Sequence, residues 1–287
     1  MKGRFLTGGL FLLMILWISM TAAQGETTKL THLTWHGHAA FEVVTPGGAV
    51  LLIDPWLKNP VNPNAQENKD PVARFEKVDY ILITHGHSDH VGDAVALAKK
   101  TGARLITNAE LGAAMVKLLG FPKEQVGFDT LLNPGGEIRI ADGEVTVMMT
   151  PAIHSSGLNN PNAGPQESDI VYGGIAAGFV LIIKNGPTIY HTGDTAYFKE
   201  MEMIGEQYEP DVALINIGGH FGMEPPMAAK AAAAVRAKLA IPHHFGTMPI
   251  LTQNPQPFID ALGKRKIPAR VMKPGETLAF EGNKLKK

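Results

Sequence analysis

The stretch that organises this sequence is Thr84–His90, which reads THGHSDH. It follows the apolar run Tyr80–Thr84, which is typical of a short buried strand. Four of its side chains are of the types that bind zinc and similar ions: His85, His87, Asp89 and His90. A tight loop at a strand end can direct the first two at one ion and the last two at a second. The alternative is a polar turn with solvent-facing histidines, which the density of ligand types disfavours.

Two metal ions need more ligands than this loop supplies, and the sequence offers further candidates just past predicted strand ends. These candidates are His154, Asp194, His243 and His244. Taken singly, each could be an ordinary hydrogen-bonded residue in a turn. Side chains at strand ends of a sandwich can converge at one edge, however, so their joint occurrence favours a metal site.

The bulk composition excludes several classes of function. The chain has 287 residues, of which 45% are hydrophobic and 18% charged, and its net charge is −1. This length suffices for one large domain with a sizeable core. The charge balance gives no reason to expect a nucleic-acid partner. The sequence contains no cysteine, which excludes thiolate nucleophiles and thiolate metal ligands.

The first 23 residues differ from the rest of the chain. Two basic residues precede the apolar run Leu10–Ile18, and small residues follow at Thr21–Ala23. This pattern predicts a signal peptide over residues 1–23, and hence an exported protein, periplasmic or secreted. The alternative is an uncleaved anchor, but the apolar run is shorter than the ~20 residues that a spanning helix needs. We therefore expect no stable membrane insertion after cleavage.

Strand-like runs dominate both halves of the remaining chain, and helices lie between them. Strands are predicted over 29–35, 40–45, 49–53, 80–84, 104–107, 137–140, 144–149, 175–183, 188–191, 212–217 and part of 270–280. Helices are predicted over 94–100, 109–119, 227–239 and 258–263. Asp142-Gly143 and Asn185-Gly186 mark two hairpin turns. The pattern indicates an α/β fold, a four-layer αβ/βα sandwich, in one domain.

In their order, these motifs resemble the metallo-β-lactamase superfamily, whose hallmark is a His-x-His-x-Asp-His loop followed by a His, a Gly-Asp and a late His. The resemblance covers residues 29–280 and is carried by Trp35–Phe41, Ile53–Trp56, Gly86–Asp93, Gly193–Thr195, Ile217–Phe221 and Ile241–Thr247. More narrowly, the chain is similar to the metal-dependent hydrolases related to L-ascorbate-6-phosphate lactonase and N-acylphosphatidylethanolamine phospholipase D. The resemblance implies a metallo-hydrolase domain over residues 24–287.

The resemblance also implies roles for the candidate ligands. The first metal would be held by His85, His87 and His154, the second by Asp89, His90 and His244, and Asp194 would bridge both. His244 is preferred because the family pattern places the ligand directly before an aromatic residue, here Phe245. His243 is the alternative. We expect two divalent ions, with zinc as the default and manganese or iron also compatible.

Several other polar residues have predicted roles near the metals. Asp54, at a strand end, is expected to hydrogen-bond a ligand histidine and so fix its tautomer. His38 either supports the metal centre or is purely structural. His220 is a candidate acid or substrate contact. The remaining histidines considered are predicted to be ordinary sheet residues: His32, His36 and His191.

The expected chemistry is metal-dependent hydrolysis of an ester, lactone or phosphodiester bond in a small-molecule substrate. A hydroxide bridging two metals would attack, oriented by Asp89 and Asp194, and Asp89, His220 or water would deliver a proton. The alternatives are a β-lactam-cleaving envelope enzyme and a non-catalytic metal-binding protein. Residues 154–169 are predicted to form a substrate-facing loop, whose polarity favours a polar or phosphorylated substrate, or else an unconstrained surface loop.

Overall fold

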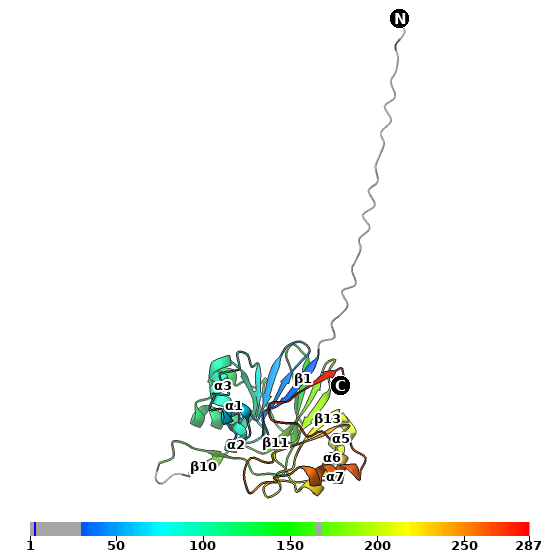
Figure 1. Cartoon of the computed structure of the whole chain (residues 1–287). Helices are drawn as coiled ribbons and strands as arrows, with labels where there is room; N and C mark the ends of the chain where they lie inside the picture. Colours follow the sequence, from blue (N-terminus) through cyan, green and yellow to red (C-terminus); the bar gives the residue numbers. More distant parts are fainter. Residues whose placement is uncertain (1–2, 4–29, 165–167, 287) are drawn as a thin grey trace.

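Two β-sheets packed face to face form the centre of the computed structural model, which describes residues 3, 30–164 and 168–286 (Figure 1). The first sheet has eight strands, in the order β16 (Lys284–Leu285), β15 (Thr277–Glu281), β1 (Thr31–Trp35), β2 (Phe41–Val44), β3 (Val50–Ile53), β4 (Tyr80–Leu82), β5 (Arg104–Asn108) and β6 (Leu131–Leu132). The second has six strands, in the order β14 (Ala240–His243), β13 (Val212–Asn216), β12 (Thr188–His191), β11 (Ala177–Ile183), β8 (Val145–Pro151) and β7 (Glu137–Ile140). A separate small hairpin is formed by β9 (Gly157–Asn159) and β10 (Ile170–Tyr172).

Helices cover the outer face of each sheet, so the predicted αβ/βα sandwich is confirmed. The helices of the first half are α1 (Pro63–Gln66), α2 (Ser88–Val91), α3 (Ala94–Thr101) and α4 (Ala109–Ala114), with a π-helical turn η1 (Met115–Leu119) and a 3₁₀ turn η2 (Lys123–Gln125). Those of the second half are α5 (Met201–Tyr208), α6 (Pro225–Ala234) and α7 (Gln256–Gly263). Figure 1 shows α1, α2 and α3 on one side of the sheets and α5, α6 and α7 on the other.

Three hydrophobic layers hold this arrangement together. Between the sheets, residues such as Phe41 of β2 and Phe179 of β11 are fully buried. Strand β11 is apolar on both faces because Val180, next to Phe179, packs instead against the layer that contains α5, α6 and α7. A third layer joins the first sheet to α3, α4 and η1, with Leu97 of α3 buried in it.

The strand directions bring one set of loops to a single edge. Strands β3, β4 and β5 are parallel, and so are β12, β13 and β14. Strand β8 runs antiparallel to β11, which runs antiparallel to β12, so β8 ends at this same edge. The loops that follow these strands carry the predicted metal ligands. The sequence motifs therefore converge because of topology, as predicted.

Most predicted elements are present, with boundaries shifted by a few residues. Both predicted hairpin turns are confirmed, and Asp142 and Asn185 adopt the positive φ angles that such turns require (53° and 59°). The alanine-rich helix predicted over 227–239 is present, but its predicted C-terminal end is wrong. It begins at Pro225 and stops at Ala234, and Arg236 then takes a positive φ of 55° that no helix continues through.

Several elements were not predicted, among them the β9–β10 hairpin and helix α5. The polar segment 154–169 was expected to be a loop, but it contains β9 and leads into β10. Helix α5 was missed because Gly205 interrupts its weak apolar pattern. This glycine has a packing role, since an added Cβ would lie 2.4 Å from the backbone oxygen of Ala234 in α6.

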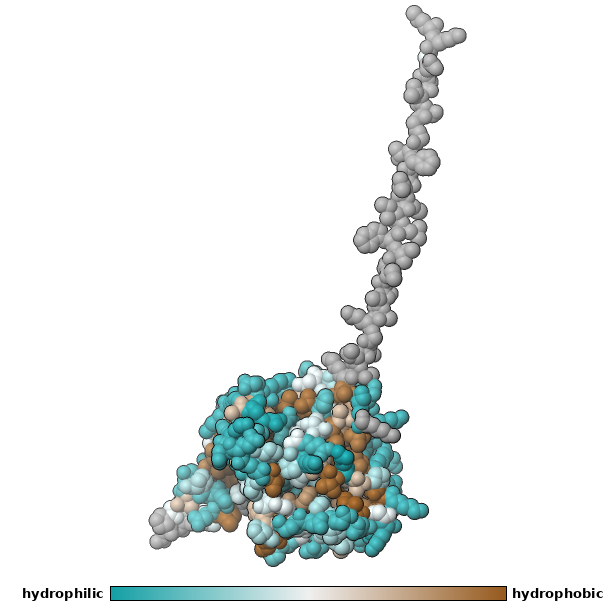
Figure 2. Space-filling view, in the orientation of Figure 1, coloured by the Kyte–Doolittle hydropathy of each residue, from teal (hydrophilic) through white to brown (hydrophobic). Residues whose placement is uncertain are grey.

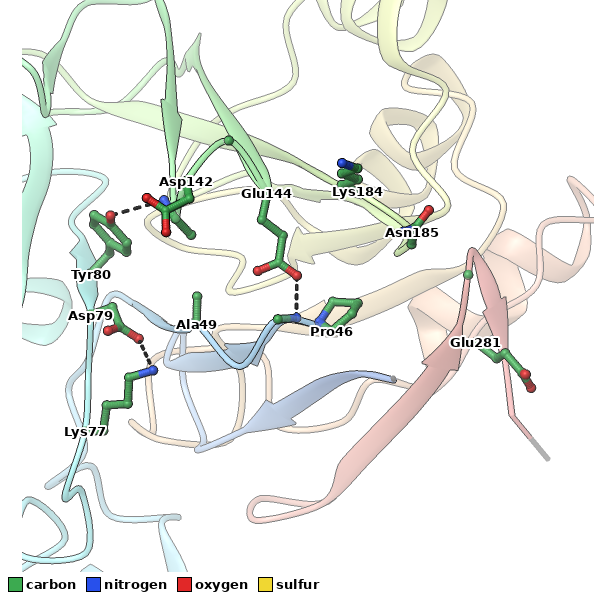
Figure 3. Close-up of a pocket in the computed structure, with 14 residues that line it drawn as sticks. Pro46, Ala49, Lys77, Asp79, Tyr80, Asp142, Glu144, Lys184, Asn185 and Glu281 are labelled. Atoms are coloured by element: carbon green, nitrogen blue, oxygen red, sulfur yellow. Dashed lines mark hydrogen bonds and ion pairs between the residues drawn. The ribbon is translucent and has the colours of Figure 1, made fainter. Parts of the chain in front are cut away.

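At the edge opposite the ligand loops, hairpin turns enclose a groove of about 1070 Å³ (Figure 3). Glu144 reaches from the β7–β8 hairpin to the other sheet, where it accepts hydrogen bonds from Thr45 Oγ1 (2.7 Å) and the backbone nitrogen of Gly47. Lys77 pairs with Asp79 on its wall (3.1 Å). The groove is larger than the cavity beside the ligand loops, but it lies far from them, and Glu144 within it links the two sheets.

The predicted signal peptide, residues 1–23, lies outside the described residues except for Gly3. Among the helices of the described chain, none combines the length and the hydropathy that crossing a bilayer requires.

Candidate metal centre

Asp54 anchors the histidine-rich loop beneath the site. It follows β3 and accepts three hydrogen bonds, from the backbone nitrogen of Thr84 (2.8 Å), from Thr84 Oγ1 (2.7 Å) and from His90 Nδ1 (2.7 Å). Because His90 donates through Nδ1, its Nε2 is the nitrogen that would bind a metal after losing its proton. The predicted role of Asp54 in fixing the tautomer of a ligand histidine therefore agrees with the geometry.

The first group of candidate ligands consists of His85, His87 and His154, whose ligand atoms lie within 4.8 Å of one another. His85 Nε2 is 2.9 Å and His154 Nε2 3.3 Å from His87 Nδ1. Burial lowers the pKa of His85 well below its usual value, with His90 adding to the effect. The pKa values of His87 and His154 are also lowered, chiefly by burial. All three imidazoles therefore favour the neutral form that binds metals.

The second group consists of His38, Asp89, His90 and His244. Asp89 Oδ2 lies at its centre, 2.9 Å from His38 Nε2, 3.5 Å from His244 Nε2 and 3.9 Å from His90 Nε2. Three of these residues are buried, while 21% of the Asp89 side chain is exposed. Asp89 is thus the member of this group that is accessible to solvent.

Asp194 lies between the two groups. Its Oδ2 is 3.7 Å from His154 Nε2 of the first group, and 3.0 Å from His244 Nε2 and 3.4 Å from His90 Nε2 of the second. Its other oxygen, Oδ1, accepts a hydrogen bond of 2.9 Å from Asn216 Nδ2. Because Asn216 holds Oδ1, Oδ2 is the oxygen of Asp194 that faces both groups.

Asn216 was not predicted from the sequence. It is fully buried at the end of β13, and its own Oδ1 accepts a hydrogen bond from the backbone nitrogen of Gly218 (3.0 Å). The signal that could have found it is an asparagine at the end of an otherwise apolar strand on the ligand edge, because a buried amide needs partners there.

The charges of the cluster fit a cation. Burial opposes a charge on Asp194, yet His244 and His90 hold its pKa well below the usual value. Burial likewise opposes a charge on His244, yet Asp194 and Asp89 raise its pKa to about 9. His90 Nε2 is buried and makes no hydrogen bond within the described chain. Two ionised carboxylates among imidazole nitrogens require positive charge, which divalent cations would supply through these same atoms.

His38 supports the carboxylate of Asp89 from behind. Its Nε2 contacts Asp89 Oδ2, and its Nδ1 lies 2.7 Å from Thr247 Oγ1. Because Asp89 can only accept, His38 donates through Nε2, and its Nδ1 then accepts from the threonine hydroxyl. The ring also packs against His244, with centroids 3.8 Å apart. Of the two roles considered for His38, support of the centre is the one that its contacts favour.

Of the two adjacent histidines after Ala240–Pro242, it is His244 that the structure brings to the cluster. His243 ends β14, packs against His191 with ring centroids 4.6 Å apart, and lies 3.4 Å from Thr192 Oγ1. His244 has a φ of 61°, which turns its side chain out of the strand and toward Asp194.

The other histidines lie away from the two ligand groups. His220 is exposed and packs edge-on against Phe221, with ring centroids 4.5 Å apart. His36 bonds Glu42 (2.8 Å), and His191 bonds the backbone oxygen of Ala39 (3.0 Å). His36 and His191 thus have the structural roles predicted for them, and a role of His220 in proton transfer stays a prediction.

Known proteins share this fold and these motifs. Residues 50–245 match the family model described as the beta-lactamase superfamily domain. The chain belongs to the metallo-β-lactamase superfamily. Within the superfamily, it is 44% identical over 253 residues to a UPF0173 metal-dependent hydrolase of Thermodesulfovibrio yellowstonii, which covers 88% of this chain and 92% of that one. A UPF0173 metal-dependent hydrolase of Anaeromyxobacter sp. strain K is 48% identical over 260 residues, 90% and 89% of the two chains.

A solved structure agrees with this family assignment. Igni18, a metallo hydrolase from the archaeon Ignicoccus hospitalis, is 33% identical and superposes with a TM-score of 0.73 over 88% of this chain and 99% of its own. The chain is accordingly a metal-dependent hydrolase of the UPF0173 family. The narrower resemblance to the lactonase and the phospholipase stays a prediction.

Proposed function

We propose that this hydrolase binds two divalent cations, with zinc as the default and manganese or iron as the alternatives, and cleaves an ester, lactone or phosphodiester bond of a small molecule. The observation that carries the proposal is the position of Asp194 Oδ2, which lies within 3.0–3.7 Å of histidine nitrogens from both groups. One carboxylate oxygen between two sets of imidazoles is the arrangement that a shared ligand of two cations needs.

Different side chains have different proposed roles in such a reaction. When bound, the cations supply a hydroxide nucleophile near neutral pH and stabilise negative charge on the substrate oxygen. Asn216 keeps Asp194 in place, and Asp54 keeps His90 in the tautomer that binds. Asp89 is ionised, partly exposed and held by His38, so it is the group proposed to orient the attacking water and to pass on its proton. His220 is a second candidate donor.

The experiment is a turnover panel on protein reloaded with zinc or manganese. The panel contains p-nitrophenyl esters, lactones, bis-p-nitrophenyl phosphate and, because of the narrower resemblance, a sugar-acid lactone and an N-acylated phospholipid. Asp194→Asn is expected to lower kcat/KM by at least about 100-fold, since it removes the shared anion. The matched control is Asp142→Asn in an exposed turn, which should keep the wild-type rate. Equal rates for Asp194→Asn and wild type would contradict the proposal.

The two alternative functions give different results on the same protein. A β-lactam-cleaving enzyme would hydrolyse β-lactams with a kcat/KM above that for every ester, lactone and phosphodiester tested. A non-catalytic metal-binding protein would hold metal and turn over none of them.

A further inference from the structure

A cavity of about 320 Å³ opens beside the two ligand groups. His87 and Asp89 form one wall, and the β9–β10 hairpin forms the facing wall through Gly157, Asn159 and Ile170. Its volume is near the lower end of the ~300–1,000 Å³ typical of small-molecule sites. Of the described residues that line it, none is a lysine or an arginine. The described lining therefore contains no lysine or arginine side chain that could pair with a phosphate or carboxylate of the substrate.

The hairpin contributes the aliphatic side chain of Ile170 and the polar side chain of Asn159 to this cavity. Side chains alternate along its strands, so Leu158 and Val171 point inward and pack in the layer beneath α4. Ile170 and Tyr172 point the other way and are 59% and 67% exposed. Gly157 contributes no side chain, and Ile170 lies over it, because an added Cβ would be 2.6 Å from Ile170 Cγ2.

Asn159 of β9 lies opposite Ile170 on this outward face, but on β10 the pattern is the reverse of what solvent alone would favour. A hairpin with one buried face normally carries polar residues on the other. Here the outward residues of β10 are a large aliphatic and an aromatic side chain, although water surrounds both. Figure 2 shows hydrophobic side chains at the base of the hairpin that projects at the lower left, as well as on other parts of this face. An exposed apolar surface beside a reactive centre is typical of a substrate-binding surface.

We propose that the substrate is an ester or lactone with a neutral hydrocarbon chain, which lies along the face formed by Ile170 and Tyr172 while the scissile carbonyl lies at Asp89. The inference rests on the proposed function and names its substrate class. This substrate class differs from the polar or phosphorylated substrate that the composition of residues 154–169 favours. The reason is Ile170, which follows that segment and contributes an apolar side chain to the cavity.

The first test measures chain-length preference. Wild-type protein reloaded with zinc is assayed with p-nitrophenyl acetate, butyrate and hexanoate. Partial burial of four additional methylenes is expected to raise kcat/KM about tenfold from acetate to hexanoate, chiefly through KM. In the double variant Ile170→Ser/Tyr172→Ser this ratio should fall below about twofold. Met203→Ser serves as the matched control, because Met203 is 64% exposed on α5 and far from the cavity, and it should keep the wild-type ratio.

The second test does not depend on turnover. Binding of aceto-, butyro- and hexanohydroxamic acid to the zinc-loaded protein is measured by calorimetry, since the hydroxamate group binds the metal centre and its alkyl chain probes the cavity. Affinity that rises with chain length in wild type and Met203→Ser, but not in the double variant, supports the proposal even where no ester is hydrolysed. Binding without ester hydrolysis would contradict the proposed reaction while supporting the proposed binding of the hydrocarbon chain. Equal chain-length dependence in the double variant, or none in wild type, would overturn the proposal.

Discussion

Two neighbouring histidines illustrate how a single backbone angle decides which side chain joins the candidate ligands. His243 continues the strand and is buried against His191, whereas the φ of 61° at His244 swings its ring to Asp194 and Asp89. Strand geometry alone sends successive side chains to opposite faces, and the turn then decides which of them reaches the cluster.

The first prediction separates these histidines. His244→Gln should lose about one of two metal equivalents, because it removes a nitrogen from the second group. His243→Gln should keep both equivalents, although burial makes it less stable. Metal content of the folded fraction, measured by mass spectrometry after gel filtration, checks this. The opposite result, with metal lost only from His243→Gln, would assign the ligand to His243.

The second prediction concerns the chain of contacts Thr247–His38–Asp89. Thr247→Val removes the hydroxyl that fixes the His38 tautomer. We expect the affinity for the more weakly bound metal to fall by about 10- to 100-fold, as is common when a group behind a ligand is lost. Thr247→Ser keeps the hydroxyl and should bind as wild type does. Competition with a chelator measures both, and equal affinities for valine and serine would show that His38 needs no such support.

Residues within one short motif could be predicted from the sequence, whereas contacts between distant residues could not. The candidate ligands of the THGHSDH loop are adjacent in the chain, so residue types and spacing suffice to place them together. The partners of those ligands come from far away: Thr247 is 209 positions from His38, and Asn216 meets Asp194 from the neighbouring strand. Strand pairing within the second sheet brings Asn216 to Asp194, and the packing of the two sheets brings Thr247 to His38.

At the scale of elements, periodic apolar runs and Asx-Gly turns identified most strands, but short or glycine-interrupted elements escaped. β9 and β10 are three residues each and are separated by a polar segment, so neither has a pattern long enough to recognise. Helix α5 contains a glycine that its neighbour requires. These two misses lie in the parts of the fold where tertiary contacts outweigh local preference.

The third prediction tests the contact between α5 and α6. Gly205→Ala should destabilise the protein by about 1–3 kcal/mol, because the new methyl group meets the Ala234 backbone oxygen and the chain must shift. Gly263→Ala at the end of α7 has open space around it and should gain ~0.5–1 kcal/mol of helix stability. Urea unfolding of both variants gives the sign of each change in the free energy of unfolding. A stabilised Gly205→Ala would contradict the close contact between α5 and α6.

For the whole molecule, the sandwich separates two edges with different roles. One edge collects the ligand loops from both sheets, and the other is fastened by Glu144 and the hairpin turns. Strands β1 and β3 both pair antiparallel with β2, so β1 begins at the edge opposite the candidate ligand loops (Figure 1). Removal of a leader should therefore leave the site intact.

The fourth prediction concerns that leader. We propose that residues 1–23 direct export and are cleaved, so the protein recovered from the periplasm or medium of an expressing bacterium should begin at Gln24. N-terminal sequencing of the recovered protein decides this. Retention of residues 1–23 in a membrane fraction would instead support an uncleaved anchor.

The central claim is that side chains from both sheets meet to hold a pair of cations. Its most direct test is the metal content of folded, chelator-treated protein after dialysis against zinc or manganese and removal of free metal. We predict about two equivalents per chain, and a rise in unfolding temperature on loading, because binding stabilises the folded state. A chain that stays folded, takes up no more than trace metal and shows no rise would contradict the account.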